Sequence, residues 1–121
     1  AGIAMLKLIK STPDLYSELE RKAAGLENGF KKNLEQTGVQ GVINRVGSMM
    51  TLFYTKEKRV TSLDDAMKSD TEKYARAFKL SLESGIYLAP SQFECLFVSY
   101  AHSNEDLETL LSANLEALKQ L

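Results

Sequence analysis

The sequence has little of the chemistry that usually marks a metal centre or a nucleophilic active site. It contains one cysteine, Cys95, and one histidine, His102, among 121 residues. A single cysteine excludes a disulfide within the chain and fits a reducing compartment, so we expect a cytoplasmic location. The two residues do not form a pattern such as CxxC or HExxH, and we therefore expect no metal site.

An excess of positive charge and a long apolar run are also missing. The net charge is −1 and the isoelectric point is near 5.9, which leaves no basic surplus for binding a phosphate backbone. No apolar run approaches the ~20 residues that a membrane helix needs. The opening segment, AGIAMLKLIK, lacks the layout of a signal peptide. We expect neither a nucleic-acid partner nor a membrane span.

Recognisable nucleotide- and cofactor-binding motifs are absent as well. The sequence has no GxGxxG and no GxxxxGK[ST]. None of the lysines sits in an apolar, glycine-flanked setting that would desolvate its amine, so all are expected on a solvated surface. We expect no catalytic and no cofactor-binding residue in this chain. Cys95 lies in an apolar run, which predicts a buried and inert thiol, and His102 precedes a helix cap, which predicts a structural hydrogen bond.

The sequence does contain the helix and strand patterns of one globular domain. Hydrophobic residues make up 44% and charged residues 26% of the chain. Apolar spacing and capping residues predict helices over 1–10, from Thr12-Pro13-Asp14 to Gly38, from Ser62, from Asp70 or Thr71 to Gly85, and from Ser103 with its capping partner Asp106. The apolar face of the fourth helix is expected to comprise Tyr74, Ala75, Phe78 and Leu82.

Strands are predicted in pairs between these helices, at Val42–Val46, Met49–Thr55, Ile86–Leu88 and Cys95–Tyr100. This order favours an α+β fold in which helices pack on a small, mostly antiparallel sheet of three to four strands. Residues 1–121 are expected to form a single domain. The helix over 1–10 is apolar on nearly all sides and has no capping residue, so we interpret it as a truncated inter-domain helix from a longer chain.

Two charged residues occupy unusual positions. Glu94 falls between two predicted apolar strands, so it is expected near the core or at its rim, where it needs a partner, a ligand or a shifted pKa. Arg45 lies inside a predicted strand. Its guanidinium is suited either to a structural ion pair or to binding the carboxylate of a ligand, and the sequence leaves both roles open.

Two motifs, NRVGSM at Asn44–Met49 and GIYLAPSQFE at Gly85–Glu94 with its continuation FVSYAH, resemble the C-terminal part of the glutamate-1-semialdehyde 2,1-aminomutase family. The resemblance runs along the whole chain, and the letters LAPSQFE are specific to that family among related aminotransferases. Cys95 and Leu96 stand where the family more often has Ala-Gly.

The resemblance implies the small C-terminal domain of a homodimeric pyridoxal-phosphate (PLP) enzyme with the aspartate-aminotransferase fold type. Such enzymes convert glutamate-1-semialdehyde to 5-aminolevulinate, the precursor of tetrapyrroles. The large domain, with the PLP lysine, would be missing here, so the fragment alone is expected to be inactive. Glu94 would reach toward the substrate, and Ser91, Gln92 and Arg45 are further candidates for substrate binding.

Two alternatives remain open at this stage. The chain could be a free-standing α+β module that binds a small molecule or a protein partner, with Glu94 at its pocket. It could also belong to a related PLP aminotransferase with another substrate, although the SQFE letters count against that reading.

Overall fold

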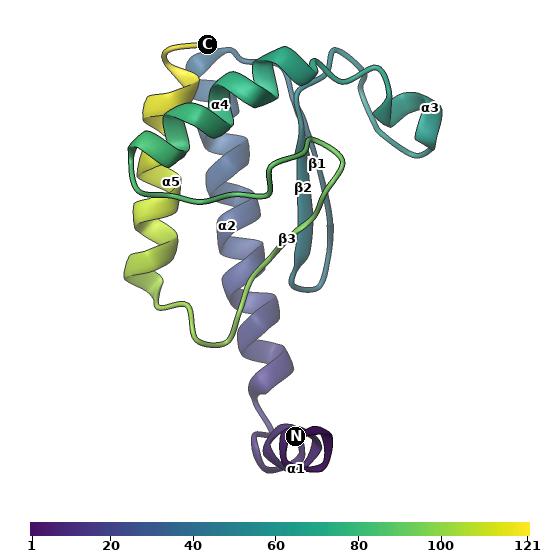
Figure 1. Cartoon of the computed structure of the whole chain (residues 1–121), viewed down its shortest axis with the longest axis vertical. Helices are drawn as coiled ribbons and strands as arrows, with labels where there is room; N and C mark the ends of the chain where they lie inside the picture. The colour runs from purple at the N-terminus through teal and green to yellow at the C-terminus, as the bar shows by residue number, and fades with distance from the viewer.

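The computed structural model describes all 121 residues and has two layers. The elements follow in the order α1 (Gly2–Ser11), α2 (Leu15–Thr37), β1 (Val42–Val46), β2 (Met49–Phe53), α3 (Leu63–Ala66), α4 (Thr71–Glu83), β3 (Leu96–Phe97) and α5 (Asn104–Leu118). Figure 1 shows α2, α4 and α5 together on one side of the sheet, while α3 lies on an arm at the other side. The α+β fold class is confirmed.

Capping residues explain where most of the helices begin and end. The Ser103 hydroxyl accepts the Asp106 N–H, and the Asp106 carboxylate accepts the Ser103 N–H in return, which is the capping box that the sequence predicts. The Asp70 carboxylate caps α4, and Gly38 ends α2 with a φ of 72°. These signals are local, so they are readable before any tertiary contact is known.

The start of α2 differs from the expectation. Asp14 is the N-cap without a side-chain cap bond, and Pro13 therefore precedes the helix instead of opening it. The Thr12 hydroxyl donates to the Leu8 carbonyl, 2.9 Å away. Thr12 thus closes α1 and does not cap α2.

The sheet has three antiparallel strands in the order β1-β2-β3. Val46 pairs with Met49 across the tight turn at Gly47, and Met49 pairs on its other side with Phe97. The strand β2 is therefore the central strand of the sheet. The apolar residues on both of its faces favour an interior strand covered on two sides, but the helical layer covers only one face (Figure 1).

The predicted strand at Ile86–Leu88 is wrong. This segment is irregular, and the Ile86 N–H donates to the Ser81 carbonyl at the end of α4, 2.9 Å away. The Tyr87 ring packs edge-on against Phe78, with 5.9 Å between centroids. The segment thus contacts α4 through the Ile86 backbone and the Tyr87 ring, which stays 74% exposed, and it is not part of the three-stranded sheet. The predicted strand Cys95–Tyr100 shortens to Leu96–Phe97.

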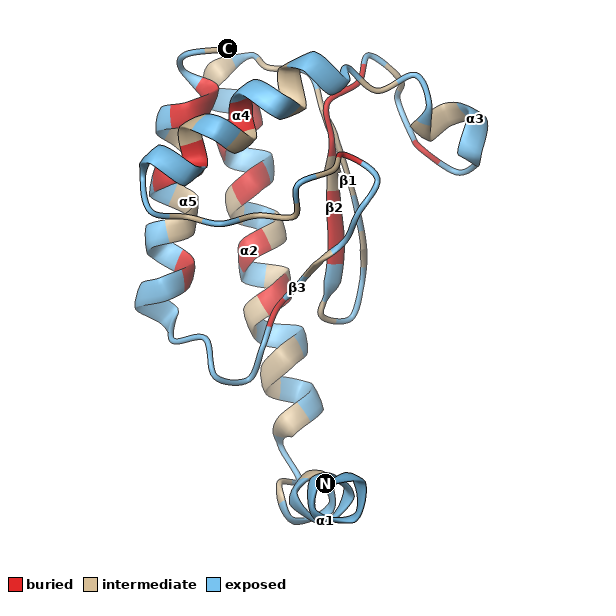
Figure 2. Ribbon diagram, in the orientation of Figure 1, coloured by how far each residue is buried: buried red, intermediate tan, exposed pale blue.

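The core lies between the sheet and the helices. One cluster comprises Ala23, Leu26, Phe30, Met50, Val98 and Leu107, and a second comprises Leu34, Tyr54, Ala77 and Leu118. Figure 2 shows buried segments along α2, α4, α5 and β2. On α4 the buried residues are Ala77 and Ser81, neither of which belongs to the apolar face expected from the sequence. Leu82, which was expected on that face, is 48% exposed.

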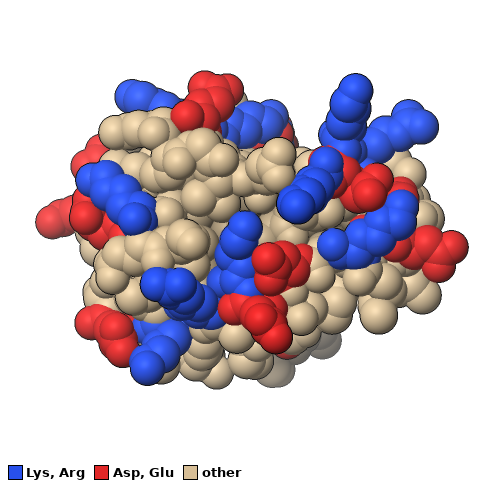
Figure 3. All heavy atoms as spheres, turned by 90° about the horizontal axis from the view of Figure 1, so that it is seen from above, with Lys and Arg blue, Asp and Glu red and all other residues tan.

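The surface of the molecule has two notable features. α1 has no buried residue and stands apart from the rest of the molecule, although it is rich in apolar side chains (Figures 1 and 2). At the end of the molecule seen in Figure 3, Lys and Arg side chains are interspersed with Asp and Glu, so neither sign dominates that face. None of the helices combines the length and the apolar character that crossing a membrane requires.

Candidate functional site

An open pocket of about 720 Å³ lies beside β3, at the edge of the sheet that has no further strand. Leu26 of α2 and Leu107 and Leu110 of α5 are among its apolar lining residues. The irregular segments 85–90 and 94–98 supply most of the remaining lining. Its ionisable groups are few, which makes the position of each one informative: Tyr87, Glu94, Cys95, His102 and Asp106.

Glu94 lies at the rim of this pocket and is exposed. Because the side chain is exposed, the carboxylate does not need the buried partner that its place between two apolar stretches led us to expect. Burial raises the pKa of the Tyr74 phenol, and the nearby negative charge of Glu94 raises it further. The Tyr74 hydroxyl donates to the Ala89 carbonyl, so this tyrosine ties the pocket wall to α4.

Gln92 is buried and holds the loop to the sheet. Its side-chain amide donates to the Leu52 carbonyl at 2.8 Å, and its side-chain oxygen accepts the Tyr54 N–H at 3.1 Å. The side chain therefore pairs with β2 as another strand would. Ser91 accepts the Phe93 N–H within the same turn, 3.3 Å away. Both candidates organise the backbone that presents Glu94.

Arg45 lies on β1 and points toward α2. Its Nε donates to Glu27 at 2.6 Å, and its terminal nitrogens contact Glu20 at 2.9 Å. A fourth contact joins Nη1 to the Gly47 carbonyl at 2.9 Å. Of the two roles left open by the sequence, these contacts match the structural ion pair. Arg45 does not line the pocket beside Glu94.

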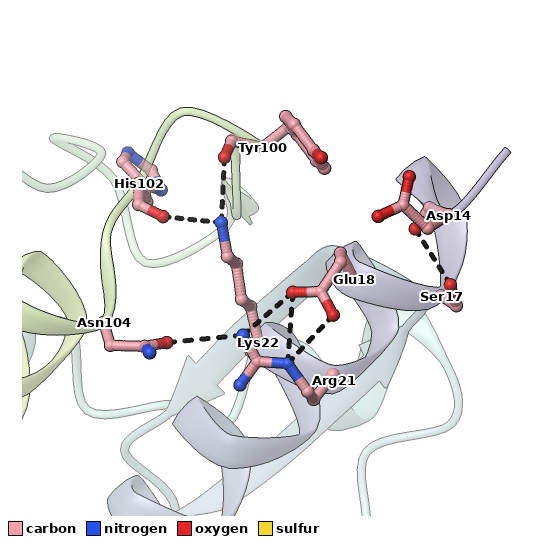
Figure 4. Close-up of polar contacts among 8 residues, drawn as sticks. All are labelled: Asp14, Ser17, Glu18, Arg21, Lys22, Tyr100, His102 and Asn104. Carbon is pink, nitrogen blue, oxygen red and sulfur yellow. Dashed lines mark hydrogen bonds and ion pairs between the residues drawn. The ribbon is translucent and has the colours of Figure 1, made fainter. Parts of the chain in front are cut away.

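Lys22 anchors the connection between β3 and α5 (Figure 4). The sequence did not predict this role. Its ammonium group donates to the Tyr100 carbonyl at 2.8 Å and to the His102 carbonyl at 2.7 Å, and it lies 5.2 Å from the centre of the Tyr100 ring. Lys22 is one helical turn before Leu26, so its stem lies beside the core stripe of α2. This spacing is the feature of the sequence that could have indicated a structural role for Lys22. The expectation that every lysine lies on a solvated surface without such a role is wrong for Lys22.

His102 has the structural role that was expected. Its Nδ1 accepts the Ser99 N–H at 3.0 Å, which closes the turn that Lys22 holds. The neighbouring Arg21 reaches Asn104 at 3.4 Å (Figure 4). These contacts fix one side of the pocket to the first half of α2.

Cys95 is exposed, and the prediction of a buried thiol is wrong. Its sulfur lies 3.4 Å from the Thr51 hydroxyl, on the face of the sheet that is turned away from α2. The apolar run around Cys95 suggested burial on both faces. The sheet, however, has a helical layer on one face only.

The pocket does not fit a covalently held PLP. Neither lysine nor arginine is among its lining residues, so neither a Schiff-base amine nor a cationic phosphate partner is present. Glu94 is instead suited to attracting a positively charged group at an apolar wall. The His, Cys, Asp and Glu residues form no cluster of three or more that could hold a metal ion.

Searches for relatives give a consistent sequence match, although no family model matches the chain. The chain is 53% identical over 98% of its length to "Glutamate-1-semialdehyde 2,1-aminomutase" of Chlorobium phaeovibrioides. It is 51% identical over 98% to the protein of that name from Chlorobium limicola, and 50% identical over 100% to the one from a Sulfurihydrogenibium species. The chain spans only 27 to 28% of the length of these relatives.

Two solved structures with the same fold are named as transaminases. A "Transaminase with PLP bound" has a TM-score of 0.75 at 20% identity, covering 98% of this chain and 26% of that one. An omega-transaminase from Sphaerobacter thermophilus has a TM-score of 0.73 at 20% identity, covering 91% of this chain and 25% of that one. At such identities the likeness shows the fold alone. The sequence relatives carry the same name as the family that the NRVGSM and LAPSQFE motifs resemble.

Proposed function

We infer that this chain is part of a protein of the glutamate-1-semialdehyde 2,1-aminomutase family, and we propose that it forms the small C-terminal domain of that enzyme. The observation that carries the proposal is that about half of its residues are identical to those of curated aminomutases over 98% of its length or more. The whole protein would convert glutamate-1-semialdehyde to 5-aminolevulinate for tetrapyrrole synthesis, as a cytoplasmic homodimer.

The proposal divides the chemistry between this chain and the rest of the protein. PLP would supply the electron sink, and it would be held by the part of the protein outside these 121 residues. This chain would supply one wall of the active site and one carboxylate. Residues 1–10, which form most of α1, would connect the two domains. On its own the chain would neither bind PLP covalently nor turn over substrate.

Glu94 would be the residue that faces the substrate. It is exposed beside an apolar wall and has no ion-pair partner within the chain. A carboxylate at this position attracts an amine and repels a second carboxylate, which suits a substrate in which an amino group has to move. Gln92 and Ser91 would act on the substrate only indirectly, because their side chains hold the turn that carries Glu94.

The experiment uses the full-length protein that contains this chain. It is purified with PLP, supplied with glutamate-1-semialdehyde, and assayed for 5-aminolevulinate. We expect product formation without an added amino donor or acceptor. Transfer of an amino group to an added keto acid, with no 5-aminolevulinate formed, would assign the protein to the related aminotransferases. A full-length protein with neither activity would favour the binding-module alternative.

A further inference from the structure

We propose that Tyr74 is a positioning residue for Glu94 and acts through the loop that carries this carboxylate. The inference relies on the proposed function for the role of Glu94 itself. It is based on a closed set of contacts among three side chains and the loop, which we call the Tyr54–Tyr74–Gln92 clamp.

Tyr74 is the residue of α4 that holds the loop backbone. Its hydroxyl donates to the carbonyl of Ala89, 2.5 Å away and five residues before Glu94. Burial raises the pKa of the Tyr74 phenol, and the charge of Glu94 raises it further, so the hydroxyl keeps its proton and remains a donor at neutral pH. Tyr74, Ala89 and Glu94 also line one narrow cavity of about 40 Å³. The hydrogen bond therefore fixes the backbone close to the carboxylate.

Tyr54, which directly follows β2, supports both attachment points of the loop. Its N–H donates to the side-chain oxygen of Gln92 at 3.1 Å, and its ring packs edge-on against the Tyr74 ring, with 6.2 Å between centroids. Its carbonyl accepts the N–H of Asp70, the residue that caps α4, at 2.7 Å. Tyr54 is only 3% exposed. The attachments at Ala89 and Gln92 thus meet at one buried residue beside the central strand.

The loop between the two attachments has little freedom to move. Only Pro90 and Ser91 separate them, and the proline ring fixes its own φ and restricts the residue before it to extended conformations. Beyond the second attachment, the Phe93 N–H donates to the Ser91 hydroxyl and the Glu94 N–H to the Ser91 carbonyl. Removing the Tyr74 hydroxyl would therefore release one end of a short, stiff segment that leads to Glu94.

Two attachments determine more than one does. Gln92 alone fixes where the loop lies, whereas a second point at Ala89 also fixes how the loop is turned. The Glu94 carboxylate forms no ion pair within the chain that could orient it, so its direction depends on this backbone. A displacement of about 1 Å from the productive position can cost up to ~100-fold in rate, so the second attachment bears on catalysis.

The test is a double-mutant cycle in the full-length protein. Tyr74→Phe removes only the hydroxyl and keeps the ring that packs on Tyr54, so the variant should fold. It should lower kcat for 5-aminolevulinate formation by about 5-fold. In the Glu94→Gln background it should cause no further fall, because the loop then carries no charge to position. Tyr16→Phe is the matched control, since Tyr16 is 68% exposed on α2, and it should leave kcat unchanged.

Hydrogen exchange gives a readout that does not depend on activity. The amides of Phe93 and Glu94 are bonded within the turn that the clamp holds. In the full-length protein they should exchange about 5-fold faster in Tyr74→Phe than in the wild type, and at the wild-type rate in Tyr16→Phe.

Two results would overturn the inference. In one, kcat of Tyr74→Phe matches the wild type, or falls by the same factor with and without the Glu94 charge, so that the hydroxyl does not act through Glu94. In the other, exchange at Phe93 and Glu94 is unchanged. A wild-type protein without aminomutase activity would instead refute the proposed function. The exchange comparison would then decide alone, with faster exchange supporting the Tyr54–Tyr74–Gln92 clamp and unchanged exchange overturning it.

Discussion

Gly29 of α2 lies directly against the side chain of Leu111 of α5. A Cβ atom at position 29 would overlap the Leu111 methyl groups, whereas one at Gly25, a single turn earlier, would meet no atom within 4 Å. Gly29 therefore permits the close approach of the two longest helices of the domain. Gly25 has no such function in this chain.

The two glycines give a matched pair of stability variants. Gly29→Ala should lower the free energy of unfolding by about 1–2 kcal/mol, because the overlap with Leu111 outweighs the better helix propensity of alanine. Gly25→Ala should raise it by about 0.5–1 kcal/mol through propensity alone. Urea unfolding of the 121-residue chain measures both values. Equal effects of the two substitutions would show that α2 and α5 do not approach as described.

The Arg45 network predicts a dependence of stability on acid. Lys31, and then Arg45, hold the pKa of the Glu27 carboxyl below its usual range, and Arg45 does the same for Glu20. Because these folded-state pKa values are depressed, their stabilisation is complete above the unfolded pKa and is lost as pH falls through the folded one. That window lies between roughly pH 5 and 3. Arg45→Met should make the fall in unfolding free energy over this window shallower, and parallel curves would contradict the prediction.

The Lys22 anchor should act locally. Lys22→Met keeps the apolar stem and removes both hydrogen bonds to the Tyr100 and His102 carbonyls. The carbonyls can then bind water, so the expected cost is about 1 kcal/mol, or a ~5-fold loss of hydrogen-exchange protection over residues 99–103. Lys32→Met serves as the control, since Lys32 is exposed on the same helix. A uniform loss over the whole domain would argue against a local anchor.

Glu94 should affect turnover and not folding. In the full-length protein, Glu94→Gln keeps the shape of the side chain and removes its charge, and Glu94 is exposed, so the fold and PLP absorbance should stay nearly unchanged. The kcat for 5-aminolevulinate formation should fall by about ten-fold or more, equivalent to ~1.4 kcal/mol of barrier. Glu108→Gln on α5 is the matched control. Kinetics that match the wild type would remove Glu94 from the site.

The isolated chain should not form a defined PLP adduct. None of its lysines lines the pocket at Glu94, so borohydride treatment with PLP should give at most scattered labelling of surface amines. Peptide mapping after the treatment measures this. A stoichiometric adduct at one lysine would contradict the division of labour proposed for the two parts of the protein.

The sequence predicted those parts of the fold that depend on local chemistry. The caps at Asp70 and Ser103, the left-handed Gly38 and the paired strands β1 and β2 all follow from residues within a few positions of one another. These interactions form from neighbours along the chain, so reading the chain in order is enough to find them.

The errors concern features that depend on distant neighbours. Tyr87 looked like a strand residue because it is aromatic, yet it packs on Phe78 of α4. Cys95 looked buried, because its sequence neighbours do not reveal that one face of the sheet lacks a helical layer. The anchoring role of Lys22 depends on two carbonyls nearly eighty positions later. Tertiary packing decides each of these cases, and a single sequence does not display it.

The side chain of Gln92, bonded to both the Leu52 carbonyl and the Tyr54 N–H, has a mechanical consequence. A loop normally positions a functional group less precisely than a helix or a strand does. Here the amide of Gln92, two residues before Glu94, bonds that loop to the central strand of the sheet. The carboxylate is thereby coupled to β2, and any tilt of the sheet would be transmitted to it.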